Sequence, residues 1–391
     1  MEQRSAPQLA VIASITATAA MGFSAIVPAL PELAVELDVD PVSVGFLQSA
    51  VAIPGVLLTP FVGLLSDRFG RRRVLLWSLA AFGVTGVAGA VAPNFGVLLA
   101  LRLAMGVPYA GLLAMTPVIL ADLFTGPMLM RAIGINTASL TIASTLGPVA
   151  GGLLATGGPQ RAFLVYGLAF PALLVARRLR LSDAPVGSFV APGVVRNELR
   201  RAGHLRDLIG SMGYTMLMMA VFVGFAFVVV PLHLEDNLGI TVAARGAVVG
   251  VANLGSAMAS LLFARTAGRV APSTLLMLGQ ALAGAGLLTL WFARDLAGVV
   301  VGVSLLGLAI GTTYNTVQVF VAGVSPPGRR GLVVGTWSSS SRLGQVLGGS
   351  LGGVLVVLFG GQTSFLLGVV VVGVLAVGWL PIRRLANREV T

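Results

Sequence analysis

Residues 63–73 read GLLSDRFGRRR and place five charged side chains within the seven positions from Asp67 to Arg73. Such clustering is unusual here, because charged residues make up only 10% of the 391-residue chain and hydrophobic residues 56%. A soluble globular protein has about 25% charged residues. Charge is therefore confined to short islands. Between the islands lie apolar runs of about 20 residues, the length at which a helix spans a bilayer core.

These apolar runs predict helices rather than strands. In lipid the backbone must satisfy its own hydrogen bonds, which leaves helices or a closed barrel, and barrel strands are alternating segments of about 10 residues. The runs are instead long, continuous and rich in Gly, Ala, Leu and Val. We predict an all-α membrane protein with twelve transmembrane helices, near 9–29, 43–65, 74–92, 96–121, 133–156, 161–180, 208–231, 243–265, 272–292, 296–320, 332–358 and 362–381.

The arginines predict the orientation. When successive connections are assigned to alternate sides, 20 arginines fall on one side and only Arg161, Arg245 and Arg294 on the other. The positive-inside rule makes the arginine-rich side cytoplasmic, with both termini inside a cell inner (cytoplasmic) membrane. The net charge of +11 is then a topology signal, and we expect no nucleic-acid partner. Ala17-Thr18-Ala19 resembles a signal-peptide cleavage site, but the apolar part before it is short, so we expect a retained span.

The spans divide into two halves. We expect an N-terminal six-helix bundle at 1–180, a cytoplasmic linker at 181–206 and a C-terminal six-helix bundle at 207–391. Small residues recur four apart in the fifth expected helix of each half, and residues four apart share a helix face. These stripes of small residues are Ser139, Ala143, Gly147 and Gly151 in the first half, and Ser340, Gly344, Gly348 and Gly352 in the second. Two such halves around a central site are the plan of a transporter that alternates between outward and inward states.

The charged stretch at 63–73 is expected to act as a conformational gate between the second and third helices. Gly63 would allow close contact with a neighbouring helix, and Gly70 would permit a sharp reversal. Asp67 would complement the dipole of a facing helix N-terminus, and Arg71 would pair with Asp122. These contacts would hold the two halves together on the inner side and break for inward opening.

The sequence resembles the major facilitator superfamily. GLLSDRFGRRR is similar to the family's signature loop, and LALRLAMG (99–106) resembles its helix 4 motif with an intramembrane arginine, Arg102. LGPVAGG (146–152) is similar to the motif of its antiporters, although Ile142 and Ala143 stand where an upstream glycine is usual. The resemblance implies the major facilitator fold and the branch of proton-coupled drug efflux pumps. The antiporter-motif residues are Gly147, Pro148, Gly151 and Gly152.

Two arginines lie inside expected spans, Arg102 and Arg342. An arginine at that depth is costly and faces a cavity or a partner, so both are candidate substrate-binding residues. Further hydrogen-bonding candidates are Tyr109, Tyr314, Asn315 and Gln318. No acidic residue falls well inside a span, which leaves Asp122 and Glu32, at the membrane edges, as candidates for carrying a coupled proton.

The function expected is secondary active transport, as proton-coupled efflux of small hydrophobic or amphiphilic organic molecules by a monomer. The alternative is a transporter of small organic anions bound by Arg102 and Arg342, because two arginines without a buried acid favour a negative ligand. A receptor on the same scaffold is a third interpretation.

Enzymatic activity is not expected. The Gly348-x-Ser350-x-Gly352 pattern lies in an apolar helix, whereas a nucleophile needs a strand-to-helix turn with histidine and acid partners. No cysteine is present, and we expect neither cofactor nor metal.

Overall fold

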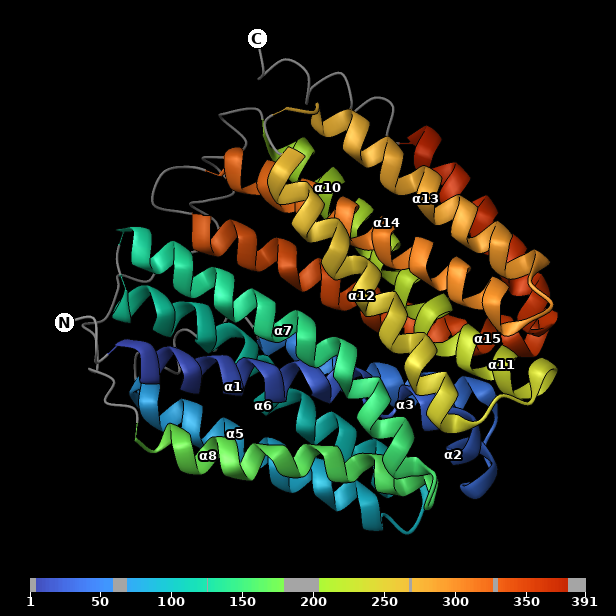
Figure 1. Ribbon diagram of the computed structural model, residues 1–391, viewed down its shortest axis with the longest axis horizontal. Coiled ribbons are helices and arrows are strands. Elements are labelled where there is room, and N and C mark those ends of the chain that lie inside the picture. The colour runs from blue at the N-terminus through green and yellow to red at the C-terminus, as the bar shows by residue number, and fades with distance from the viewer. Residues whose placement is uncertain are drawn as a thin grey trace. The chain divides into compact units, whose positions relative to one another are not determined.

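The computed structural model describes residues 5–58, 69–124, 126–178, 204–266, 269–325 and 330–378. Within these ranges the chain forms helices and their connections and no strand (Figure 1). The elements are α1 (Ser5–Ser24), η2 (Val27–Ala29), α2 (Leu30–Glu36), α3 (Pro41–Ala50), α5 (Arg71–Ala88), η3 (Gly89–Val91), α6 (Phe95–Leu123), α7 (Gly126–Ala155), η4 (Pro159–Leu168), α8 (Ala169–Ala176), α10 (Leu205–Gly224), η5 (Phe225–Val229), α11 (Val230–Leu238), α12 (Val242–Thr266), α13 (Pro272–Phe292), α14 (Leu296–Gly323) and α15 (Arg330–Gly378).

The helices are long and apolar enough for a multi-pass membrane protein. Ten spans in the described ranges could cross a membrane, and a shorter apolar helix covers Val42–Leu58. The last span, Val333–Ala376, leaves helical geometry at Gly360, where φ is 74° and ψ is 159°. Because a positive φ favours glycine, this residue divides α15 into the two helices expected at 332–358 and 362–381. The arrangement is consistent with twelve spans.

The chain forms two compact units. Unit 1 comprises Met1–Asp40, Phe46–Phe189 and Thr241–Gly250, and unit 2 comprises Pro41–Gly45, Val190–Ile240 and Val251–Thr391. The first turns of α12 therefore belong to unit 1. Most of the linker expected at 181–206 lies outside the described residues, which resume at His204.

Unit 1 is built around α1, which packs on α6, α7 and α8, while α5 packs on α6 and α8. The glycine stripe of α7 makes the closest of these contacts possible. A Cβ atom added at Gly147 would lie 3.2 Å from the Cα atom of Met21, and one added at Gly151 would collide with the carbonyl group of Ala25. In lipid, small residues allow this approach of two backbones.

In unit 2 the glycine stripe of α15 packs on α10 in the same way. A Cβ atom added at Gly344 or Gly348 in α15 would collide with a carbonyl oxygen of α10, that of Met216 or Ala220 respectively. One added at Gly352 would lie 2.9 Å from the carbonyl oxygen of Gly224. In each half, therefore, the stripe of the fifth helix closes on the first helix, as internal duplication requires.

The fourth helix of each half also begins in the same way. The Asn94 side chain accepts a hydrogen bond from the Val97 amide at 3.0 Å at the start of α6. The Asp295 side chain accepts one from the Gly298 amide at 2.8 Å at the start of α14. Both are N-caps that satisfy a backbone donor left free by the first helical turn.

Replacing Gly348 by alanine is expected to cost about 1–3 kcal/mol of stability, because the added methyl group forces α15 away from the backbone of α10. Gly335→Ala is the matched control on the same helix, since nothing lies within 4 Å of a Cβ atom there. Thermal unfolding of the purified protein in detergent measures both variants. Equal melting temperatures for the two would contradict the role given to the stripe.

Candidate functional site

The side chain of Arg102 is buried in unit 1, with an exposed fraction of 1%. Its Nη1 donates to the Tyr166 hydroxyl at 2.9 Å and to the Gly22 carbonyl at 3.4 Å, and its Nε donates to the Leu47 carbonyl at 3.3 Å. The Tyr166 hydroxyl itself donates to Gly22 O at 2.8 Å. A buried charge is tolerated only when it is hydrogen-bonded, and these acceptors come from three other segments, α1, α3 and η4.

The Gly22 carbonyl group is available as an acceptor because α1 ends at Ser24. The carbonyl groups of a helix's last turn lack intrahelical donors, and here side chains supply them. Besides the bonds to Gly22, Gln48 Nε2 donates to the Phe23 carbonyl at 2.9 Å, and Gln48 is fully buried. The end of α1 is thus the point at which polar side chains of α3, α6 and η4 meet.

Two buried polar atoms in this cluster have hydrogen-bonding capacity left. Arg102 Nη2, a donor, and Gln48 Oε1, an acceptor, have no partner in the part of the chain that the structure describes. One is cationic and the other neutral, so the cluster can still bind an anionic or a polar neutral group. We call Arg102, Tyr166, Gln48 and the carbonyl groups of Gly22 and Leu47 the arginine cluster.

Tyr109, expected from the sequence, lies next to the arginine cluster on α6. Its ring stacks against Phe82 with centroids 6.4 Å apart, and Phe82 meets Tyr166 edge-on at 5.6 Å. Arg102 and Tyr109 are therefore connected through two aromatic residues. Sequence reasoning missed Tyr166 and Gln48. The signal that was available is rarity, because the chain has only four tyrosines.

Glu32 on α2 forms an ion pair with Arg245 on the first turns of α12, with Arg245 Nη2 donating to Glu32 Oε1. Both residues belong to unit 1. Arg245 is fully buried, whereas 31% of the Glu32 side chain remains exposed. The carboxylate expected to carry a proton is therefore partnered by an arginine, and its second oxygen, Oε2, is buried with no hydrogen-bond partner among the described residues.

The antiporter-motif residues lie at a three-helix junction in unit 1. Gly147 and Gly151 face α1, as described above. Gly152 faces the first turns of α12, since a Cβ atom there would lie 2.8 Å from the Val242 carbonyl oxygen. In return, a Cβ atom at Gly246 would collide with the carbonyl group of Pro148. The motif thus holds α7 against α1 on one side and against the start of α12 on the other.

In unit 2 the candidates fall into two groups. Tyr314 on α14 packs on Trp337 with ring centroids 4.8 Å apart, and Trp337 Nε1 donates to Thr215 Oγ1 at 2.8 Å. The half-buried Arg342 lies close to Tyr314. Asn315 points elsewhere, because its Nδ2 donates to Ser260 Oγ on α12 at 2.8 Å.

The remaining candidate on α14 is Gln318, which is exposed. The structure therefore brings Tyr314 and Arg342 together but not Asn315 with either. Sequence reasoning missed Trp337, which is fully buried between α10 and α14.

The gate is only partly within the described residues. Gly63 and Asp67 lie outside them, as does the side chain of Asp122. Gly70 precedes α5 with φ 88°, a conformation that favours glycine. Arg71 is the first residue of α5. The Arg71–Asp122 pairing stays a prediction.

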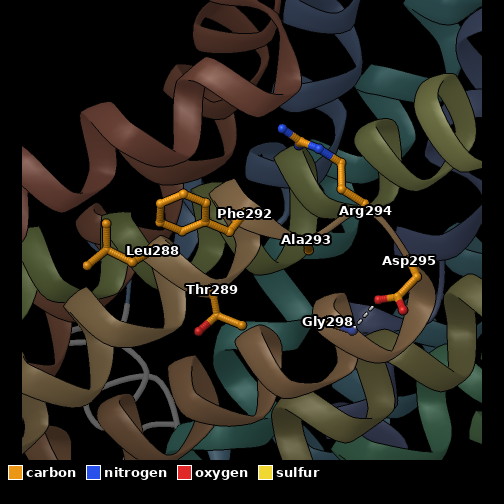
Figure 2. Close-up of a pocket in the computed structure, with 7 residues that line it drawn as sticks. All are labelled: Leu288, Thr289, Phe292, Ala293, Arg294, Asp295 and Gly298. Carbon is orange, nitrogen blue, oxygen red and sulfur yellow. Dashed lines mark hydrogen bonds between the residues drawn. The ribbon is translucent and has the colours of Figure 1, made fainter.

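A pocket of about 500 Å³ lies at the connection between α13 and α14 in unit 2 (Figure 2). It is formed by the end of α13, the start of α14 and the connection between them, with Arg294 turned away from Asp295 and Asp295 engaged in capping α14. None of the substrate-binding candidates lines it, so we do not assign it a role in transport. Its lining residues are Leu288, Thr289, Phe292, Ala293, Arg294, Asp295 and Gly298.

Two units of membrane-length helices with buried polar clusters define a multi-pass membrane protein. The sequence profile of the Major Facilitator Superfamily matches residues 12–228 and 211–391. The chain therefore belongs to this family, whose members are transporters that bind small-molecule substrates and are not enzymes.

Relatives and a solved structure agree with this assignment. The chain is 28% identical over 346 residues to the uncharacterized MFS-type transporter YceJ of Bacillus subtilis, which covers 86% of this chain and 87% of the relative. It is 27% identical over 355 residues to the multidrug efflux pump LfrA of Mycolicibacterium smegmatis, covering 76% and 70% of the two chains. The human organic anion transporter MFSD10 superposes with a TM-score of 0.68 at 20% identity over 94% of this chain and 97% of its own, which shows the fold alone.

Tyr166→Phe is expected to cost about 1–3 kcal/mol, because it removes an acceptor from the buried Arg102 guanidinium. The matched control is Thr85→Val on α5, which removes one hydroxyl group from the far less buried hydrogen bond to the Ala81 carbonyl. Thermal unfolding in detergent compares the two variants. If Tyr166→Phe melts with the wild type, the hydroxyl does not stabilise the arginine.

Proposed function

We propose that this chain exports small hydrophobic or amphiphilic organic molecules in exchange for protons. It would act as a monomer in the cytoplasmic membrane, with both termini in the cytoplasm, by alternating access. The observation that carries the proposal is the junction of α1, α7 and α12 at Gly147–Gly152. This junction gives the antiporter-like motif a definite packing role against the segment that bears Arg245.

Similarity to LfrA, which is named a multidrug efflux pump, supports the export of varied organic molecules. The orientation rests on the side of the membrane to which the arginines fall. The cavity candidates Arg102, Tyr109, Tyr314 and Arg342 are those we assign to substrate binding, with Asn315 and Gln318 as further hydrogen-bonding groups. The conformational gate of Gly63, Asp67, Gly70, Arg71 and Asp122 belongs to the same proposal.

The proton carrier we favour is Glu32, with Asp122 as the second candidate. Glu32 pairs with Arg245, and protonation of the carboxylate would remove the charge that holds this pair together. Arg245 lies on α12, which begins in unit 1 and continues into unit 2 beyond Gly250. A proton arriving at Glu32 would therefore loosen the start of a helix shared by both units. Part of the Glu32 side chain is exposed, although Oε2 of its carboxylate is buried.

Flux measurements in proteoliposomes under an imposed pH gradient test this proposal, with neutral, cationic and anionic compounds screened in parallel. Wild-type efflux is expected to be accelerated several-fold by a proton gradient of opposite direction. Glu32→Gln keeps the side chain's shape but cannot exchange a proton. This variant should still exchange substrate across the membrane without responding to the gradient.

Glu36→Gln is the matched control, since Glu36 is exposed one turn further along α2. It should respond to the gradient like the wild type. A wild-type flux that ignores the gradient rules out antiport. Gradient-stimulated flux in Glu32→Gln would move the proton carrier away from Glu32 and leave Asp122.

A second candidate function is the transport of small organic anions. The donor Nη2 of Arg102, which has no partner among the residues that the structure describes, favours it, together with Arg342 beside Tyr314. A cationic binding site would attract a carboxylate or phosphate, whereas a basic drug would prefer a buried carboxylate.

Arg342→Ala separates the two functions. If the substrates are anions, this variant should lose anion binding by at least about ten-fold while binding of neutral hydrophobic compounds is retained, because one charge-assisted hydrogen bond contributes about 1.5–3 kcal/mol. Equilibrium binding of anionic and neutral compounds to the purified protein gives the answer. An equal loss for both kinds of compound would argue against a charge-specific site.

A further inference from the structure

A groove on unit 1 between α5 and α6 is not used by the proposed transport cycle. Its volume is about 440 Å³. Arg73 is the one charged residue in its lining, and Ser78 adds a hydroxyl group. Its lining residues are Leu58, Phe69, Arg73, Val74, Trp77, Ser78, Ala81, Val107, Pro108 and Gly111.

Small residues form part of the lining of the groove. Ser78 and Ala81 lie on α5 and Gly111 on α6, and a Cβ atom added at Gly111 would lie 2.7 Å from Ser78 Oγ. The two helices therefore approach each other closely at Ser78 and Gly111. Trp77 forms one wall with 72% of its surface exposed, and Val107 is 50% exposed. An apolar surface of this kind, on two membrane-length helices, faces lipid rather than water.

Along α5, the side chains that line the groove change from charged to aromatic to small, which matches the sequence of headgroup, interface and acyl chain in a phospholipid. Arg73, Trp77 and Ala81 are four residues apart and share one face of α5. Arg73 stands at the charged end of the helix, Trp77 one turn further in, and the small residues deeper still. Tryptophan is enriched at the membrane–water interface, where its ring lies at the level of the headgroups. Eight residues of helix rise about 12 Å, close to the roughly 15 Å of hydrocarbon in one leaflet.

The positive charge of Arg73 favours a lipid with an anionic headgroup. Arg71, Arg72 and Arg73 are consecutive, and Arg72 is already engaged, since its Nη2 donates to the Arg177 carbonyl at 2.7 Å. Arg73 is exposed, and within the ranges that the structure describes it makes no hydrogen bond or ion pair. A guanidinium group binds phosphate oxygens through two parallel hydrogen bonds.

We propose that this groove is a binding site for one anionic phospholipid, with the phosphate at Arg73 and an acyl chain lying along Trp77 toward Ala81 and Gly111. The site does not depend on which substrate the protein transports. The orientation proposed above decides only the leaflet, which is then the cytoplasmic one, where basic groups near the surface attract anionic lipids. An apolar transport substrate entering from the membrane is the competing occupant, and the experiment distinguishes it.

Photolabelling in proteoliposomes tests the site. The full-length protein is placed in phosphatidylcholine vesicles containing a trace of phosphatidylglycerol or phosphatidylcholine with a diazirine in the acyl chain, and the labelled peptides are mapped. We expect phosphatidylglycerol to label the α5 and α6 residues of the groove about five-fold more than phosphatidylcholine does, since a basic residue near the surface contributes about 1 kcal/mol.

Arg73→Gln should remove this preference and leave the two lipids labelling the groove equally. Arg178→Gln is its matched control, because Arg178 is also exposed at the arginine-bearing end of unit 1 but lies outside the groove. Ala81→Phe should block labelling by both lipids, and Leu174→Phe, at a position 61% exposed on α8, controls for added bulk.

Three outcomes would overturn the proposal. One is equal labelling of the wild-type groove by the two lipids, and another is a preference for phosphatidylglycerol that survives in Arg73→Gln. The third is displacement of the label by a transported compound at concentrations that saturate flux, which would make the groove a substrate entrance. Arg73→Gln changes only an exposed side chain, so the test stands even if Ala81→Phe fails to fold.

Discussion

The architecture depends on how closely two helix backbones can approach in a solvent that is itself apolar. Leaving lipid for a helix–helix contact gains little for a leucine side chain, so association relies on packing and on hydrogen bonds between helices. In unit 1 the glycines of α7 let α1 approach until backbone touches backbone at Ala25 and Met21. In unit 2 those of α15 do the same for α10. The two glycine stripes therefore have the same structural role, because each lets the fifth helix of its half pack closely on the first.

The same solvent explains where the polar groups lie. A charge in the hydrocarbon region is retained only where other groups satisfy it. Arg102 meets that condition through the Gly22 carbonyl at the end of α1, the Leu47 carbonyl of α3 and the Tyr166 hydroxyl. The end of α1 thus serves two purposes, packing against α7 through Ala25 and accepting hydrogen bonds at Gly22. A small change at this point would be felt by α3, α6, α7 and η4 together.

The Glu32–Arg245 pair adds a charge interaction to the same unit. It links α2 to the first turns of α12, which are also held by the glycine and proline motif of α7. Packing at Gly152 and Gly246 sets the position of the α12 start, and the ion pair adds a contact that depends on protonation. In the proton-coupled mechanism that we propose, the ion pair would respond to a proton while the packed glycines fix the helix.

Much of this protein could be predicted from its sequence because the relevant signals are local. Hydropathy along the chain predicts membrane helices, the spacing of Gly147 and Gly151 predicts a packing face, and the position of Gly70 predicts a reversal. Arginine clusters predict which connections share a side of the membrane. Each of these follows from neighbouring residues and from the physics of a bilayer, without knowledge of any partner.

Only the tertiary structure decided which distant groups meet. Glu32 and Arg245 are 213 positions apart, and no local sequence pattern predicts that they pair. Tyr166 lies 64 positions beyond Arg102, to which it is hydrogen-bonded. Trp337 and Thr215 are 122 residues apart. A single polar residue in an apolar helix indicates that a partner is needed, because an unsatisfied group in lipid is costly. Which partner it finds depends on how the helices pack, and local sequence does not contain that information.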